Sequence, residues 1–308
     1  MRPGALAAAA LACACACSTG PKQPTAPEVP TRARTAGDDI LPSLPVGADL
    51  VIELDLARLR ANAVVGPVVA AVAALPGKRV QEIARAGGAV ATLAVALVGG
   101  ADAAVVAAYR VGSPEAVTLV AVRGGDALPG ATELGGGLRL AGPEAWVARV
   151  RKVMAETEPG LDDDAELMVT RTRAMPAKAS GAWLRVAARF GFDARVEMAS
   201  RFDLDVAPAT VSIWADVADD LALVAVLGGG NAEEVQSLAG ALERTRDRAT
   251  RDPVIRSLGL APPVAATRID RGDDVARAIF LVGPHRLERV AARAVKLLSP
   301  DALAGERL

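Results

Sequence analysis

The feature that most constrains the fold is an order of strands, turns and a closing helix that occurs twice. In each half, an opening strand with alternating hydrophobicity leads into helical sequence, at residues 48–60 and 182–190. Each half then closes with strand sequence and a Gly-Pro pair, at Gly142-Pro143 and at Gly283-Pro284. Proline at the first helical position loses no intrahelical hydrogen bond, so both pairs predict the start of a helix.

Apolar runs predict four strand pairs, three of them hairpins around short turns, and hairpins give antiparallel sheets on which helices pack. The pairs are residues 90–98 with 103–111, 117–122 with 138–140, 211–217 with 221–227, and 264–270 with 275–282. The sequence therefore predicts an α+β fold with mainly antiparallel sheets and helices packed on them, built from two diverged strand-hairpin-helix halves. The alternative is that such units simply recur in α+β proteins.

The predicted halves span residues 40–160 and 161–308, and the acidic stretch 156–166 is a candidate linker between them. If the halves are copies, residues 45–156 and 180–298 should share one strand order, and Ala232–Leu258 should be an insertion of the second. The opening "ADLVIELDLARL" (residues 48–59) and the hairpin-helix order resemble bacterial envelope proteins of unknown function. That resemblance implies a fold and a location in the cell envelope, but no activity.

All three cysteines of the 308-residue chain lie in "LACACACSTG", residues 11–20. Arg2 is followed by an apolar run that stops at Ser18, short of the roughly 20 residues that span a bilayer, which is typical of a secretory signal peptide. The stretch is similar to bacterial lipoprotein signals, in which a small residue precedes the lipid-bearing cysteine. Leu11, two residues before Cys13 and six before Cys17, departs from the family's leucine position.

The lipoprotein resemblance implies cleavage before one cysteine and an N-terminal lipid that anchors the chain to a membrane. We expect Cys17, with Cys15 next, because use of Cys17 discards the other thiols with a signal peptide of residues 1–16. Ser18, where inner-membrane lipoproteins often have Asp, favours the outer membrane. Plain secretion with cleavage nearby is the alternative. Residues 17–39 are rich in Pro, Thr and charge, and they predict a disordered tether.

Composition excludes several classes of function. The formal net charge is −1 and only 3% of residues are aromatic, which argues against a nucleic-acid partner. No cysteine follows Cys17, so the mature fold has no disulfide. The sequence predicts no catalytic residue, no cofactor and no metal site.

Four motifs suggest a binding or catalytic site, but a structural explanation fits each of them better. The glycine-rich turn at 226–235 lacks a phosphate-binding signature, and Asn231 with Glu234 predicts a helix cap instead. His285, the single histidine, is expected at the surface. Asp162–Asp164 reads as a solvated charge run, and Arg271-Gly272-Asp273 as a turn between strands.

Two surfaces are candidate recognition sites. Trp214 is in phase with Asp216, and Trp183 with Arg185, so adjacent strands would gather an indole-rich polar patch. Packing between the halves would explain the same pattern. The last helix carries a basic stripe that could rest on anionic headgroups, or simply face solvent. Its members are Arg286, Arg289, Arg293 and Lys296.

The sequence therefore predicts a lipid-anchored envelope protein, facing the periplasm, that works as a non-enzymatic binding or assembly module for an unknown envelope protein or lipid. A carrier or chaperone for a lipophilic ligand is an alternative that requires a deep apolar cavity. A hydrolase that uses carboxylates alone is another, and it requires two acidic groups in one cleft. Its candidates are Glu53, Asp55, Asp203 and Asp205.

Overall fold

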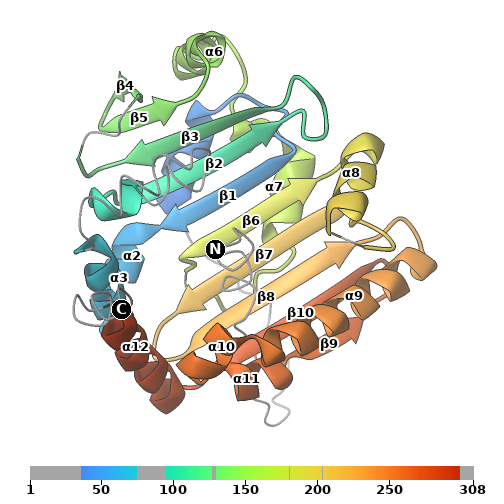
Figure 1. Ribbon diagram of the computed structural model, residues 1–308. Coiled ribbons are helices and arrows are strands. Elements are labelled where there is room, and N and C mark those ends of the chain that lie inside the picture. Colours follow the sequence, from blue (N-terminus) through green and yellow to red (C-terminus); the bar gives the residue numbers. More distant parts are fainter. Residues whose placement is uncertain (1–35, 75–94, 127–129, 180, 203, 299–308) are drawn as a thin grey trace, which may run out of the picture.

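The structure, a computed structural model, describes residues 36–74, 95–126, 130–179, 181–202 and 204–298. One antiparallel sheet of ten strands, in the order β4-β5-β3-β2-β1-β6-β7-β8-β10-β9, forms its centre (Figure 1). The strands are β1 (Leu50–Asp55), β2 (Ala103–Tyr109), β3 (Val117–Arg123), β4 (Thr132–Gly135), β5 (Leu138–Ala141), β6 (Leu184–Arg189), β7 (Thr210–Val217), β8 (Leu221–Gly228), β9 (Arg268–Arg271) and β10 (Val275–Val282).

Helices cover both faces of this sheet, which confirms the predicted α+β class. Figure 1 shows α9, α10 and α11 in front of the last strands and α7 behind the centre. The helical segments are η1 (Ala36–Asp39), η2 (Leu41–Ser43), α2 (Leu56–Ala61), α3 (Gly66–Ala73), α6 (Glu144–Met154), η3 (Leu161–Asp163), α7 (Ala165–Thr172), α8 (Phe192–Phe202), α9 (Ala232–Arg251), α10 (Pro253–Leu258), α11 (Ala261–Ala265) and α12 (Pro284–Leu298).

The two halves have the same strand order, as predicted. Counted outward from the centre, the first half runs β1-β2-β3-β5-β4 and the second runs β6-β7-β8-β10-β9. The opening strands β1 and β6 meet at the centre in antiparallel register, with Glu53 opposite Arg185. The closing helices also match, since Val147 of α6 and Leu287 of α12 are both buried against the sheet.

The predicted insertion lies in the second half only, and it is longer than expected. Helices α9, α10 and α11 separate β8 from β9, whereas residues 124–131 join β3 to β4. The insertion ends at Ala265 rather than at Leu258 because Pro262 and Pro263 fit the first turn of another short helix. The strand predicted over 264–270 accordingly begins at Arg268.

One predicted hairpin is wrong. Residues 95–98, expected to pair as a strand with 103–111, are helical, and residues 90–94 lie outside the described residues. Strand β2 pairs instead with β1 and β3. Alanine-rich sequence has high helix propensity and no clear strand period, and Gly100, at φ 75°, lies in the turn that ends the helix.

The acidic stretch 156–166 is part of the folded body and not a linker. Leu161 of η3 is completely buried, and Gly160 forms a β-bridge with Pro45. Asp164 accepts a hydrogen bond from Leu167 N (3.2 Å) and caps α7. Leu161 therefore holds this acidic segment against the folded body. The many charges of the segment gave no indication of this packing.

The folded body begins earlier than predicted. Residues 18–35 of the expected tether lie outside the described residues, but Ala36–Asp39 form η1. Together with Ile40, Leu41 and Leu44, which are buried, they make an N-terminal segment (residues 36–45) that packs across β1 and β2. Among the described residues, no helix is long and apolar enough to cross a membrane.

Candidate functional site

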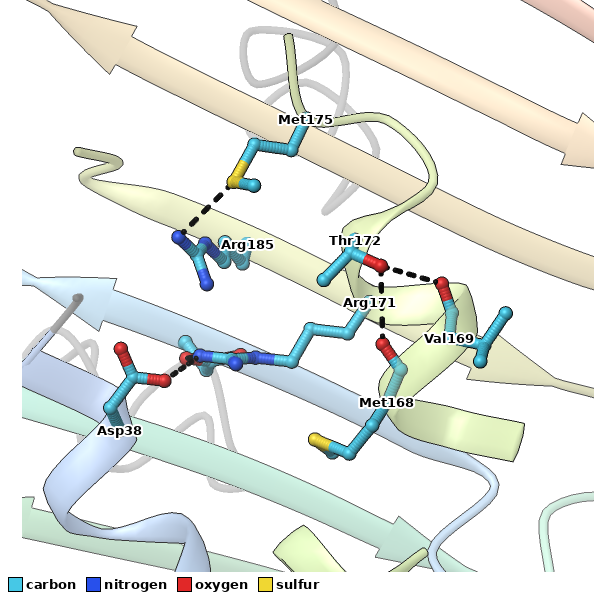
Figure 2. Close-up of polar contacts among 8 residues, drawn as sticks. Asp38, Met168, Val169, Arg171, Thr172, Met175 and Arg185 are labelled. Carbon is cyan, nitrogen blue, oxygen red and sulfur yellow. Dashed lines mark hydrogen bonds and ion pairs between the residues drawn. The ribbon is translucent and has the colours of Figure 1, made fainter. Parts of the chain in front are cut away.

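The most deeply buried charges lie where the two halves meet. Arg171 of α7 donates hydrogen bonds from Nε to Glu53 Oε1 (2.5 Å) and from Nη2 to Glu53 Oε2 (2.6 Å). Its Nη2 also donates to Asp38 Oδ1 at 2.6 Å, and Figure 2 shows Arg171 extending along β1 toward Asp38. Arg185 of β6 lies beside this cluster, with its Nη2 3.6 Å from Met175 Sδ (Figure 2).

The electrostatics of this cluster indicate a structural role. Burial acts to lower the pKa of Arg171, but its hydrogen bonds and charge pairing with Glu53 and Asp38 outweigh that effect and raise the pKa. Glu53 was a candidate for carboxylate chemistry, and a second carboxylate, Asp38, does converge with it. Both bind one buried guanidinium, however, so the carboxylates neutralise a cation instead of facing a substrate.

The other candidate carboxylates also have structural partners. Asp55 accepts a hydrogen bond from Arg58 N (2.8 Å) and caps α2. Asp205 pairs with Arg244 at 3.0 Å, and Asp203 lies outside the described residues. The predicted pair of carboxylates in a cleft is therefore not formed by Glu53, Asp55 and Asp205.

The predicted tryptophan surface is wrong as a surface, although its strands are neighbours. Arg185 of β6 lies opposite Trp214 of β7, but both side chains are buried. Trp214 Nε1 donates to Gly181 O (3.0 Å), and Asp216 receives two hydrogen bonds of 2.7 Å from Arg58. Trp183 is half-buried against the apolar core. The strand alternation correctly places Arg185, Trp214 and Asp216 on one face of the sheet, but their side chains are buried or paired within the fold. Trp183 packs instead with the apolar cluster of the opposite face.

The glycine-rich turn before α9 is closed by its own helix, as predicted. Asn231 Oδ1 accepts from Glu234 N at 2.9 Å, which confirms the cap. Glu234 Oε2 accepts from Gly230 N (2.8 Å) and from Arg195 of α8 (2.5 Å). The backbone hydrogen bond from Gly230, with Arg195 adding to it, lowers the pKa of Glu234. A carboxylate of the chain itself thus occupies the position that a phosphate would need.

Three weaker motifs are resolved by their surroundings. His285 is almost completely exposed, as predicted, and lies 3.8 Å from Glu288. Gly272 and Asp273 lie in the turn between β9 and β10, also as predicted, and Arg271 is the last residue of β9. Of the run Asp162–Asp164, Asp164 is buried and binds Arg189 at 2.5 Å, so the prediction of a solvated run fails there. Among the described residues, no group of three or more metal-ligating side chains comes together.

A pocket lies where the C-terminal end of α6 meets η2 and η3. Its lining mixes proline, glycine and acidic side chains with a single valine: Pro42, Val153, Glu156, Thr157, Glu158, Pro159, Gly160, Asp162 and Asp163. Glu158 is held by Arg149 (3.1 Å) and Lys152 (3.3 Å). This acidic, open pocket differs from the deep apolar cavity that a lipid carrier would need.

Among the described residues, the two exposed phenylalanines both belong to α8, which also carries an exposed valine, and the sequence did not reveal this surface. Phe192, Val196 and Phe202 are 78%, 54% and 61% exposed, and they lie within an arc of about 120° on one side of the helix. We call these three residues the apolar row of α8. In Figure 1 the helix lies at the edge of the molecule, beyond the end of β6.

Helix α8 is fixed to the body by other residues. Ala194 is buried against Gly112, where an added Cβ would lie 2.6 Å from Ala194 Cα. Gly112 has φ 83°, so both its backbone and the close approach require glycine. Arg195 donates to Ala207 O (2.9 Å) and to Glu234. The apolar row is therefore presented outward by a firmly positioned helix.

The predicted basic stripe of α12 lies on the outer side of that helix. Arg289, Arg293 and Lys296 are exposed, and Arg286 is half-buried. Leu287 and Ala291, which are buried, lie on the other side. The structure thus brings the basic side chains together as predicted.

Comparisons with known proteins give a general likeness of fold. No family model matches this chain, and no curated protein matches its sequence. Among solved structures, crystal form III of TP0453 is 10% identical, with a TM-score of 0.43, over 83% of this chain and 98% of that one. Crystal form I of TP0453 is 11% identical, with a TM-score of 0.40, over 84% and 97%. Likeness at this level carries no functional argument.

Proposed function

We propose that this chain is a lipid-anchored cell-envelope protein that works as a non-enzymatic binding or assembly module. The observation that carries the proposal is the apolar row of α8, because soluble surfaces rarely present large apolar side chains together on one helix. The buried charged groups support it, since Glu53, Arg171 and Asp216 are engaged in ion pairs that hold the fold together.

The anchor is the lipid on Cys17. A diacylglyceryl thioether with an additional acyl chain provides the two hydrophobic signals that stable anchoring requires. Residues 18–35 then connect the lipid to the body, which begins at Ala36. Because Asp38 is held by Arg171, the tether ends at a fixed point on the sheet. Ser18 after the cysteine favours the outer membrane, with the body facing the periplasm.

The apolar row of α8 is the binding surface for a partner protein of the envelope. Burying a Phe or Val side chain contributes about 1.5–3 kcal/mol, and central aromatic anchors of this kind commonly dominate interfaces. The charged residues of α8 comprise Asp193, Arg195, Glu197 and Arg201, which leave the helix without net charge. The partner surface is therefore expected to be apolar at its centre.

Site-specific photo-crosslinking in native membranes tests this proposal. A crosslinker at Val196, in the apolar row, should give a defined adduct, and the same crosslinker at Glu197, on the polar side, should not. Phe192→Ser combined with Phe202→Ser should remove the adduct at Val196. Equal adducts from both positions, or none from Val196, would overturn the assignment of α8 as the binding surface.

A further inference from the structure

Helix α12 and its neighbour α10 form a surface with an excess of positive charge. The surface comprises five basic side chains, which we call the basic surface: Arg256, Arg286, Arg289, Arg293 and Lys296. The two helices pack together, and the guanidinium of Arg293 lies against Gly259, the residue that ends α10. All except the half-buried Arg286 are exposed.

The arginines of the basic surface lack acidic partners. Within the described part of the chain, Arg256, Arg286, Arg289 and Arg293 form no ion pair, whereas Arg58, Arg171 and Arg189 are all paired. Glu288, the one acidic residue of α12, points to another side of the helix and lies near His285. Among the described residues, no ion pair therefore cancels the positive charge of these four arginines, although the chain as a whole has a net charge of −1.

Exposed apolar side chains accompany these cations. Leu297 follows Lys296 directly and lies one turn beyond Arg293, and Val254 is exposed on α10. From Arg286 to Leu297 the row extends for about 16 Å along the helix. Surfaces that meet lipid headgroups combine cations with a few apolar side chains in this way.

We infer that the basic surface binds anionic phospholipid headgroups. Guanidinium groups bind phosphate in a bidentate manner, and an extended row of cations matches a surface of many phosphates. This inference depends on the proposed anchor only for the place where lipid binding occurs. Eighteen residues reach about 60 Å when fully extended, so the segment 18–35 is long enough for the basic surface to meet the membrane. The apolar row of α8 lies on a different part of the molecule and remains available for a partner (Figure 1).

Vesicle binding tests the inference without the lipid anchor. The chain from Ser18 onward contains every described element and no cysteine. It should sediment with vesicles of phosphatidylcholine mixed with phosphatidylglycerol and not with phosphatidylcholine alone. Each basic residue near such a surface contributes about fivefold to the partition coefficient. The triple variant Arg289→Gln, Arg293→Gln, Lys296→Gln should therefore lose about a hundredfold.

A matched control removes the same charge elsewhere. Arg151→Gln, Lys178→Gln and Arg201→Gln alter three exposed basic residues on other segments, and binding should change little. Equal losses in both triple variants would overturn the inference, since binding would then follow net charge alone. Binding to an acidic protein or to nucleic acid without binding to anionic vesicles would also overturn it.

A fluorescent probe reports which surface enters the lipid. Attached to the single cysteine of Leu297→Cys, an environment-sensitive dye should shift to shorter wavelength with anionic vesicles, and attached through Val196→Cys it should not. A shift at position 196 in place of 297 would assign the lipid contact to α8 and contradict this inference. Failure of Cys17 lipidation would leave both vesicle results unchanged, so the two proposals fail separately.

Discussion

Glu53 of β1 and Arg171 of α7 form a bidentate ion pair, with distances of 2.5 Å and 2.6 Å and side chains that are 3% and 1% exposed. The pair connects the centre of the sheet to α7, the helix that precedes β6, the opening strand of the second half. Asp38 extends it to the N-terminal segment. A charge pair so deeply buried is stable only while every member has its partners, because an isolated charge in the interior is costly.

Glu53→Gln should therefore lower the free energy of unfolding by about 3–5 kcal/mol, since it leaves the Arg171 charge incompletely compensated. Urea denaturation measures this. The control is Glu115→Gln, which breaks the exposed pair with Arg110 and should cost less than about 1 kcal/mol. Replacing both partners, Glu53→Leu with Arg171→Met, should recover much of the loss. A single variant as stable as the parent would show that the pair is not structural.

The lowered pKa of Glu234 predicts a pH-dependent contribution to stability. A carboxylate whose pKa is depressed in the folded state stabilises the fold above its ordinary value of 4.5, and that stabilisation disappears as the pH falls through the folded pKa. Glu234→Gln should thus melt at a lower temperature than the parent near neutral pH, and the two curves should converge in acid. Glu233→Gln, on the same turn but exposed, is the control, and an equal effect there would contradict the assignment to Glu234.

Limited proteolysis should distinguish the tether from the body. The composition of residues 18–35 predicts cleavage throughout that span. The resistant fragment should begin near Ala36, because Ile40, Leu41 and Leu44 are buried beneath it. Intact-mass measurement of the fragment locates the cut. Early cleavage within residues 40–45 would contradict the packing of the N-terminal segment, and resistance across 18–35 would contradict the tether.

The apolar row of α8 should contribute little to stability. Phe192→Ser, Val196→Ser and Phe202→Ser should each change the free energy of unfolding by no more than about 0.5 kcal/mol, because these side chains are exposed. Ala194→Leu, on the same helix, should cost about 1–3 kcal/mol, since Gly112 leaves no room for a larger side chain. Large losses in the serine variants would show that the row packs within the fold.

Local patterns in the sequence predicted much of the fold. The alternation of residues 50–55, the hairpin turns and the two Gly-Pro helix starts each depend on neighbours in the chain, and they led to the shared strand order. The strand expected at residues 95–98 failed because alanine fits a helix as well as a strand, and only the pairing of β2 decides between them.

The site was harder to predict from the sequence. Its contacts join residues that are far apart in the chain, or depend on which side of a helix faces the body. Arg171 meets Glu53 across 118 positions, and no local pattern pairs them. The spacing of Phe192, Val196 and Phe202 is visible in the sequence, but the same spacing is typical of a buried face. Only the position of Ala194 against Gly112 turns that row outward. The basic stripe of α12 was predicted because its charges alone identify the outer side.

Mass spectrometry of the N-terminal peptide from native membranes tests the central claim most directly. The account predicts that the mature chain begins at Cys17 with a diacylglyceryl group on its sulfur. It also predicts that Cys17→Ser abolishes labelling with radioactive palmitate and lets a high-salt wash, which screens the charges of the basic surface, release the protein from the membrane. Cys13→Ser, within the discarded signal, should leave labelling intact. An N-terminus without lipid, or undiminished labelling of Cys17→Ser, would contradict the account.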